Sequence, residues 1–138
     1  MAGIDRLPGG SETLLVVDDH EMIWEFLTEG LQHLGYSVLL AENGSDAVEV
    51  YRENLGRVDL VLMDMVMPKA GGQQAFMEIR EMDPNAKILL SSGYVNEEDV
   101  RTLLELGACG FLPKPLRLAV IAQAVRDVLD GKPLDLYG

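Results

Sequence analysis

The chain has 138 residues, 48% of them hydrophobic, which is enough for one domain with a buried core and too apolar for a disordered chain. Its 11 basic and 23 acidic residues give a net charge of −12, which argues against direct binding to nucleic acid or to an anionic membrane surface and favours cations and basic partners. The single cysteine excludes an intrachain disulfide framework and a multi-cysteine zinc site and fits a cytoplasmic setting; without an apolar run near 18 residues, we expect no membrane insertion.

Short apolar runs alternate with one-sided helical patterns along the chain. Glycines and a proline end several of the helical patterns, as they do at Gly35, Pro84 and Gly107. On the inward faces of the first and third helices the pattern places Phe26 and Met77. The predicted elements are strand 13–17, helix 20–34, strand 36–40, helix 45–54, strand 58–63, helix 72–82, strand 86–90, helix 96–106, strand 108–112 and helix 116–129.

Five strand–helix units in this order predict an α/β fold, a doubly wound five-stranded parallel sheet with helices on both faces. Strands that are apolar without alternation agree with burial on both faces. We expect a domain over residues 12–131, preceded by a flexible lead-in of residues 1–11 and followed by a C-terminal tail of residues 132–138. The strand order cannot be read from spacing, but ligand sites in such sheets lie at the carboxyl ends of the strands.

Polar residues follow these predicted strands. Asp18 and Asp19 end the first strand, Asp64 the third and Ser92 the fourth, and Lys114 follows the fifth. Taken singly, each has an ordinary role as a helix cap, a turn residue or a solvated surface group. Asp64 is harder to dismiss, because an uncompensated charge in an apolar stretch is costly. Their joint appearance predicts a shared cleft with three carboxylates, a hydroxyl and an ammonium.

Three clustered carboxylates repel one another, and a hard dication such as Mg²⁺ removes that conflict. A phosphoryl group then fits between Lys114 and Ser92. Of the two histidines, His33 is expected to be structural, near the apolar side of the first helix, whereas His20 follows the aspartate pair and could border the cleft. Without an identifiable general base, the remaining chemistry is nucleophilic attack by a carboxylate, which forms an acyl phosphate.

Four motifs in order carry a family resemblance: VVDD at 16–19, MDMVMP at 63–68 with Gly72 beyond it, SSG at 91–93 and GFLPKP at 110–115. Over about residues 12–130 the chain resembles the receiver domain of two-component response regulators, the flavodoxin-like chemotaxis-regulator family with its (βα)5 three-layer sandwich. The resemblance implies a phosphoprotein rather than a conventional enzyme, one that promotes phosphoryl transfer onto its own Asp64.

The resemblance also implies the metal ligands. Asp19 would bind Mg²⁺ directly, Asp18 largely through water, and the backbone carbonyl of Val66 would complete the protein ligands beside Asp64.

The remaining implied roles concern the phosphoryl group and the switch. Ser92 and Lys114 would bind the phosphoryl oxygens, and the Lys114–Pro115 bond would be cis. Phe111 would be the switch aromatic and would act together with Ser92. The implied partners are a histidine kinase or phosphotransfer protein and a downstream target or fused output domain. The segment before Thr13 resembles the linker in front of receivers of hybrid histidine kinases.

Three alternative functions need other residues or other evidence. A haloacid dehalogenase-type phosphatase needs a second aspartate two residues after Asp64, where Val66 stands. A dinucleotide-binding domain needs a glycine-rich turn in place of residues 18–20. A pseudo-receiver, which is an interaction module without phosphorylation, stays open as the alternative. The cognate kinase, output, pathway, oligomeric state and phosphoryl lifetime are not encoded in any feature of the sequence.

Overall fold

The computed structural model describes residues 7–65, 71–93 and 97–132 of the chain. Within these residues, strands and helices alternate without exception, which confirms the five predicted strand–helix units. The elements are β1 (Thr13–Val17), α1 (Glu21–His33), β2 (Ser37–Ala41), α2 (Gly44–Glu53), β3 (Leu60–Asp64), α3 (Gly72–Met82), β4 (Ile88–Ser92), α4 (Glu97–Glu105), β5 (Gly110–Pro113) and α5 (Leu118–Leu129).

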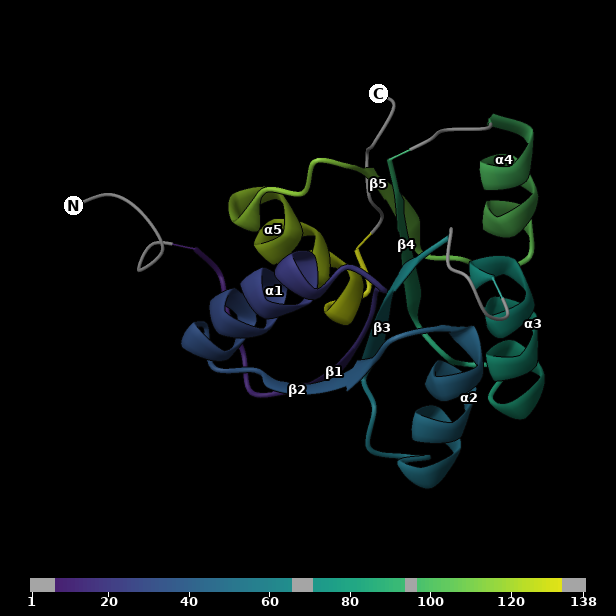
Figure 1. Ribbon diagram of the computed structural model, residues 1–138, viewed down its shortest axis with the longest axis horizontal. Coiled ribbons are helices and arrows are strands. Elements are labelled where there is room, and N and C mark those ends of the chain that lie inside the picture. The colour runs from purple at the N-terminus through teal and green to yellow at the C-terminus, as the bar shows by residue number, and fades with distance from the viewer. Residues whose placement is uncertain (1–6, 66–70, 94–96, 133–138) are drawn as a thin grey trace.

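The strands form one parallel sheet in the order β2-β1-β3-β4-β5, so the chain winds outward in both directions from β1 (Figure 1). Helices α1 and α5 cover one face of the sheet, and α2, α3 and α4 cover the other. This is the predicted three-layer sandwich. The reversal of winding lies between β1 and β3, where open α/β sheets place their ligand sites.

The core consists of one apolar cluster on each face of the sheet. Neighbouring strand residues alternate between the clusters: Leu15 and Val17 face α2, α3 and α4, whereas Leu14 and Val16 face α1 and α5. All four side chains are buried. Burial on both faces explains why these strands read as continuous apolar runs.

Two predicted core residues lie on the surface instead. Phe26 is 43% exposed and Met77 is 48% exposed. Each stands next to a residue that is buried, Leu27 and Phe76 respectively. One step along a helix turns the side chain by about 100°, which takes it out of a stripe that the neighbouring residue occupies.

The segment before β1 packs against the helical layer of α1 and α5. The backbone N–H of Gly10 donates to the carbonyl of Leu34 at 3.2 Å, and Arg126 donates to the Gly9 carbonyl at 3.0 Å and to a Glu12 carboxylate oxygen at 2.7 Å. Gly35 has a φ of +104°, and a Cβ there would lie 2.4 Å from the Gly10 carbonyl oxygen, so only glycine fits this turn. The domain boundary between residues 11 and 12 stays a prediction.

No helix in the part of the chain that the structure describes is long and apolar enough to cross a membrane.

Candidate functional site

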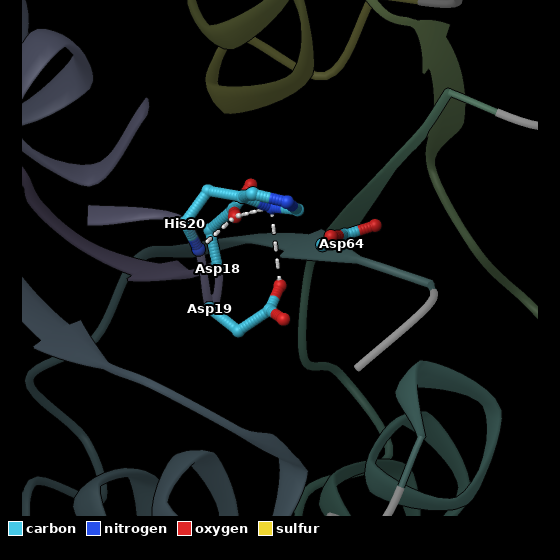
Figure 2. Close-up of side chains that lie close together, drawn as sticks. All are labelled: Asp18, Asp19, His20 and Asp64. Carbon is cyan, nitrogen blue, oxygen red and sulfur yellow. Dashed lines mark hydrogen bonds and ion pairs between the residues drawn. The ribbon is translucent and has the colours of Figure 1, made fainter. Parts of the chain in front are cut away.

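Two buried aspartates stand side by side where β1 and β3 end. The register pairs Val17 with Met63, so Asp18 and Asp64 follow on adjacent strands. Both are only 3% exposed. Asp19, the next residue, is more accessible, with 29% of its side chain exposed. The three carboxylates predicted to converge at this edge therefore do so (Figure 2).

Lys114 supplies positive charge to this cluster from the loop after β5. Its Nζ donates to Asp18 Oδ2 at 2.9 Å and to Asp64 Oδ2 at 3.2 Å. Burial alone would lower the pKa of Lys114, but the hydrogen bonds and charges of Asp18 and Asp64 outweigh burial and leave the pKa raised. The ammonium is therefore firmly protonated at neutral pH and ties the ends of β1 and β3 to the loop after β5.

The backbone around Lys114 is fixed by the neighbouring strand. Its N–H donates to the carbonyl of Ser92 at 2.9 Å, and the Lys114–Pro115 peptide bond is cis, as the resemblance implied. Ser92 is the last residue of β4 and is 1% exposed. It therefore lies at the same edge of the sheet as the carboxylates.

His20 belongs to the same cluster. Its backbone N–H donates to Asp18 Oδ1 at 2.9 Å, and its Nδ1 lies 3.3 Å from Asp18 Oδ1 and 3.3 Å from Asp19 Oδ1 (Figure 2). One ligand atom from each of Asp18, Asp19, His20 and Asp64 lies within 4.8 Å of the others. The signal for His20 in the sequence was its position directly after the aspartate pair at a strand end.

His33 differs from its prediction. It stands in the last turn of α1 and is exposed rather than packed near the apolar side of that helix. The reason is the same single helical step that exposes Phe26, because its neighbour Leu34 takes the partly buried position.

Two further predicted residues have different outcomes. Phe111, in β5, is 1% exposed and packs in the cluster shared with α2, α3 and α4. Val66, whose carbonyl was the predicted third metal ligand, lies outside the described residues.

The approach of α3 to the site depends on Gly72. A Cβ at this position would lie 2.6 Å from the Asp64 carbonyl oxygen and 2.6 Å from Met65 Cα, both backbone atoms that cannot yield. The Gly72 N–H donates to the carbonyl of Met65 at 3.0 Å. The N-terminus of α3 is thus packed directly against the end of β3.

The formal charge of the site fits a divalent cation. Among the residues that the structure describes, three carboxylates face the ammonium of Lys114, which leaves a formal charge of −2 with the imidazole neutral. Oxygen ligands that are clustered and partly buried suit Mg²⁺. The acidic cluster is therefore compatible with a bound Mg²⁺ ion.

Comparisons with known proteins agree on one family. The model of the response regulator receiver domain matches residues 14–126. The chain is 36% identical over 121 residues to sensor kinase CckA of Brucella abortus, covering 88% of this chain but 13% of that protein. It is 37% identical over 119 residues to chemotaxis protein CheY of Halobacterium salinarum, covering 86% of this chain and 98% of that protein.

Solved structures give the same result. A response regulator receiver domain protein from Clostridium thermocellum superimposes with a TM-score of 0.83 at 25% identity, covering 87% of this chain and 95% of that one. A chain of the CheX-CheY-BeF3-Mg complex from Borrelia burgdorferi gives a TM-score of 0.82 at 32% identity, covering 85% of this chain and 88% of that one.

Proposed function

Because this chain belongs to the family of response regulator receiver domains, we propose that its Asp64 accepts a phosphoryl group from a histidine kinase or a phosphotransfer protein. The observation that carries the proposal is the position of Asp64. It is a buried carboxylate at the carboxyl end of β3, next to Asp18 on β1 and 3.2 Å from the Lys114 ammonium. The pseudo-receiver alternative is not favoured, since Asp64, Ser92 and Lys114 are all present at this edge.

The transfer itself is a displacement at phosphorus. An Asp64 carboxylate oxygen attacks the phosphorus of a phosphohistidine, the P–N bond breaks, and the leaving imidazole keeps the electron pair and takes a proton from water. The Lys114 ammonium lies 3.2 Å from an Asp64 oxygen and so holds a positive charge beside the attacking carboxylate. The chain acts on its own side chain, so it is a signalling module rather than a conventional enzyme.

The proposed metal ligands are Asp18, Asp19 and Asp64, with the predicted contribution of Val66 outside the described residues. Mg²⁺ bound there would neutralise charge on the transferring phosphoryl group. The chain's own contribution is orientation: His20 N–H fixes one oxygen of Asp18, and Lys114 holds the other. Lys114 and Ser92 lie at the same edge of the sheet, and we propose that their ammonium and hydroxyl bind the phosphoryl oxygens.

Two contacts of this kind supply a free energy close to what a switch needs. A phosphoryl group adds about two negative charges, and each charge-assisted hydrogen bond to it contributes about 1.5–3 kcal/mol. Two such bonds therefore give about 3–6 kcal/mol, against the roughly 5.5 kcal/mol that takes a population from 1:99 to 99:1. Ser92 ends β4, and the register pairs Leu90 of β4 with Phe111 of β5, so a shift of Ser92 reaches Phe111 through adjacent strands.

The output lies with partners. CckA and a cyclic di-GMP phosphodiesterase of Thermotoga maritima are longer proteins of which this chain matches 13% and 33%. CheY of Halobacterium salinarum is matched over 98% of its length. We therefore propose a cytoplasmic receiver whose switched surface contacts either a separate target protein or a fused output domain.

Labelling with acetyl phosphate tests the phosphoacceptor. With Mg²⁺, the intact mass of the wild type should increase by one phosphoryl group, and Asp64→Asn should abolish this adduct. Asp59→Asn is a matched control, because Asp59 precedes the same strand at its opposite end, where it accepts a hydrogen bond from the Thr13 N–H. Comparable labelling of Asp64→Asn and the wild type, or loss of labelling in Asp59→Asn alone, would reject Asp64 as the acceptor.

A further inference from the structure

The carboxylate cluster contains an imidazole that the phosphoryl transfer does not use. His20 Nδ1 is 3.3 Å from one oxygen each of Asp18 and Asp19, and the backbone hydrogen bond from His20 to Asp18 holds the residue in place. Its side chain is 65% exposed, so the ring is accessible to a solvated ion. Figure 2 shows the ring beside the carboxylates of Asp18 and Asp19.

The imidazole and the ammonium use different oxygens of Asp18. His20 contacts Oδ1, whereas Lys114 donates to Oδ2 of Asp18 and to Oδ2 of Asp64. A cation held by His20 Nδ1 and by Oδ1 of Asp18 and Asp19 therefore does not require the Lys114 ion pairs to break. The His20 side of the cluster therefore presents an oxygen each of Asp18 and Asp19 that Lys114 does not contact.

The distances match a particular coordination geometry. In a tetrahedral site with bonds of about 2.0–2.1 Å, neighbouring ligand atoms lie about 3.3 Å apart, whereas in an octahedral Mg²⁺ site they lie about 2.9 Å apart. His20 Nδ1 lies 3.3 Å from Asp18 Oδ1 and 3.3 Å from Asp19 Oδ1, the length of such a tetrahedral edge. A carboxylate oxygen of Asp64 lies within 4.8 Å of these atoms, so it would have to move closer to become a fourth ligand.

We propose that His20 is a metal ligand in this site and shifts its preference toward divalent cations that favour imidazole, namely Co²⁺, Ni²⁺ and Zn²⁺. Imidazole suits these ions, whereas Mg²⁺ is bound by oxygen ligands and retains several waters. A preference for Co²⁺ or Zn²⁺ over Mg²⁺ can also arise from the other ligands of the site. The quantity that tests the proposal is therefore the part of this preference that is lost when His20 is replaced. The inference rests on the proposed function, because it concerns the same carboxylates.

A competing role for His20 is purely positional. In that case the imidazole only hydrogen-bonds Asp18 and Asp19 and orients them. Its loss then weakens the binding of every divalent cation by the same factor. If His20 is instead a direct ligand, its loss weakens the binding of the imidazole-preferring ions selectively. The ratio of the Co²⁺ and Mg²⁺ dissociation constants separates the two roles.

The chain offers a matched pair of variants, because His20 and His33 are its only histidines. Dissociation constants for Co²⁺ and Mg²⁺ would be measured at one fixed pH by the fluorescence of Trp24, the only tryptophan, which lines a hollow together with Asp18 and Asp19. All variants would carry Cys109→Ser, which removes the single thiol as a competing Co²⁺ ligand. Cys109 directly precedes β5 and therefore lies at the amino ends of the strands, whereas the carboxylates lie at their carboxyl ends.

His20→Asn should weaken Co²⁺ binding at least about tenfold, since even outer-shell partners of a metal typically contribute 10–100-fold, and should weaken Mg²⁺ binding by less than about threefold. His33→Asn should change neither constant by that much. In proton NMR of Co²⁺-loaded protein, the other histidine variant, His33→Asn, should retain one paramagnetically shifted imidazole N–H signal. That signal should be missing from His20→Asn.

Equal weakening of Co²⁺ and Mg²⁺ in His20→Asn, or no shifted imidazole signal in the wild type, would overturn the proposal. The NMR measurement on the wild type keeps it testable even if His20→Asn fails to fold. Acetyl phosphate labelling with Mg²⁺ separates the two hypotheses: labelling at Asp64 with a metal ratio independent of His20 rejects only the ligand role. A metal ratio that depends on His20 without labelling at Asp64 rejects only the phosphoacceptor role.

Discussion

Replacing Lys114 by methionine tests how the carboxylate cluster is held together. The substitution keeps an apolar stem of similar length and removes the ammonium, whose Nζ lies 2.9 Å from Asp18 Oδ2 and 3.2 Å from Asp64 Oδ2. Both aspartates are 3% exposed, so water cannot replace the lost charge efficiently. We expect a large loss of stability that a divalent cation partly restores.

The magnitude follows from the two ion pairs. At an effective dielectric constant of about 20, unit charges about 3 Å apart attract by about 5 kcal/mol, so the two pairs together give about 10 kcal/mol before desolvation. Desolvation offsets most of this attraction, and removing one partner of a buried pair typically costs about 3–5 kcal/mol. We therefore expect Lys114→Met to lower the free energy of unfolding by about 3–5 kcal/mol in EDTA.

The direction of the pH dependence sets the assay conditions. The pKa of Lys114 is raised in the folded protein, so its stabilisation is fully present below the unfolded lysine value of about 10.4 and is lost as the pH rises through the folded value. Urea unfolding at neutral pH therefore measures the whole contribution of the ion pairs.

Mg²⁺ should distinguish this ion-pair effect from general damage. For the wild type, Mg²⁺ at a hundred times its dissociation constant should add about 2.7 kcal/mol to the unfolding free energy. Lys114→Met should gain at least about 1.4 kcal/mol more than the wild type at the same concentration, the equivalent of tenfold tighter binding, because the ammonium no longer competes for Asp18 and Asp64.

Lys87→Met is the matched control. It removes the same charge from a partly buried lysine whose Nζ donates to the Leu129 carbonyl at 3.2 Å, near the start of β4. Its cost should be about 0.5–1.5 kcal/mol and should not depend on Mg²⁺. If Lys114→Met lost no more stability than Lys87→Met, or lost the same amount in EDTA and in Mg²⁺, the electrostatic account of the site would be wrong.

Three further predictions follow from other contacts. Gly72→Ala would overlap the backbone at the end of β3 and should cost about 1–3 kcal/mol in thermal unfolding, whereas Gly71→Ala, whose Cβ would lie 3.8 Å from the nearest atom, should cost less than about 0.5 kcal/mol. Equal losses would contradict the close approach. The hydrogen bond from Arg126 lowers the pKa of Glu12 below its usual 4.5, so Glu12→Gln should cost about 0.5–1 kcal/mol at pH 7. This cost should disappear as the pH falls through the folded pKa of Glu12, and urea unfolding that shows it growing in acid would refute the assignment. Beryllofluoride with Mg²⁺ should change amide exchange in β4 and β5, and unchanged exchange there would remove the proposed switch.

The sequence was sufficient for the architecture and for most of the site because both depend on local signals. Apolar runs alternating with helical stripes predict the five units, and Asp18, Asp19, Asp64, Ser92 and Lys114 each stand at or just after a strand end. Asp64 shows the strength of this rule, since a lone charge in an apolar run can be tolerated only where the strand reaches the edge of the sheet. Its observed place as the last residue of β3 confirms that expectation.

What the sequence could not supply depends on contacts between distant segments. The sequence predicts that Lys114 shares a cleft with Asp18, 96 positions away, because parallel strands end at one edge of the sheet. It does not predict that the loop after β5 brings Nζ to Asp18 and Asp64 in particular, since those contacts depend on the strand order around β1. The predicted burial of His33 and Phe26 is wrong for a different reason. A single step along the helix decides whether a side chain is buried, and the limits of the apolar stripe on α1 depend on where α5 lies.

The order of events at the site follows from its charge. Before any cation binds, the described part of the site, with its three carboxylates and the Lys114 ammonium, carries a net charge of −2, which repels a phosphoryl group that brings about two more negative charges. Lys114 cannot relieve this repulsion alone, since its single charge is already shared between Asp18 and Asp64. Under the proposed function, we therefore expect a dication to bind before a phosphoryl group is admitted. We also expect Lys114 to reach the phosphoryl oxygens only as the cation replaces it in neutralising the aspartates, which would couple metal binding, transfer and the switch through one side chain.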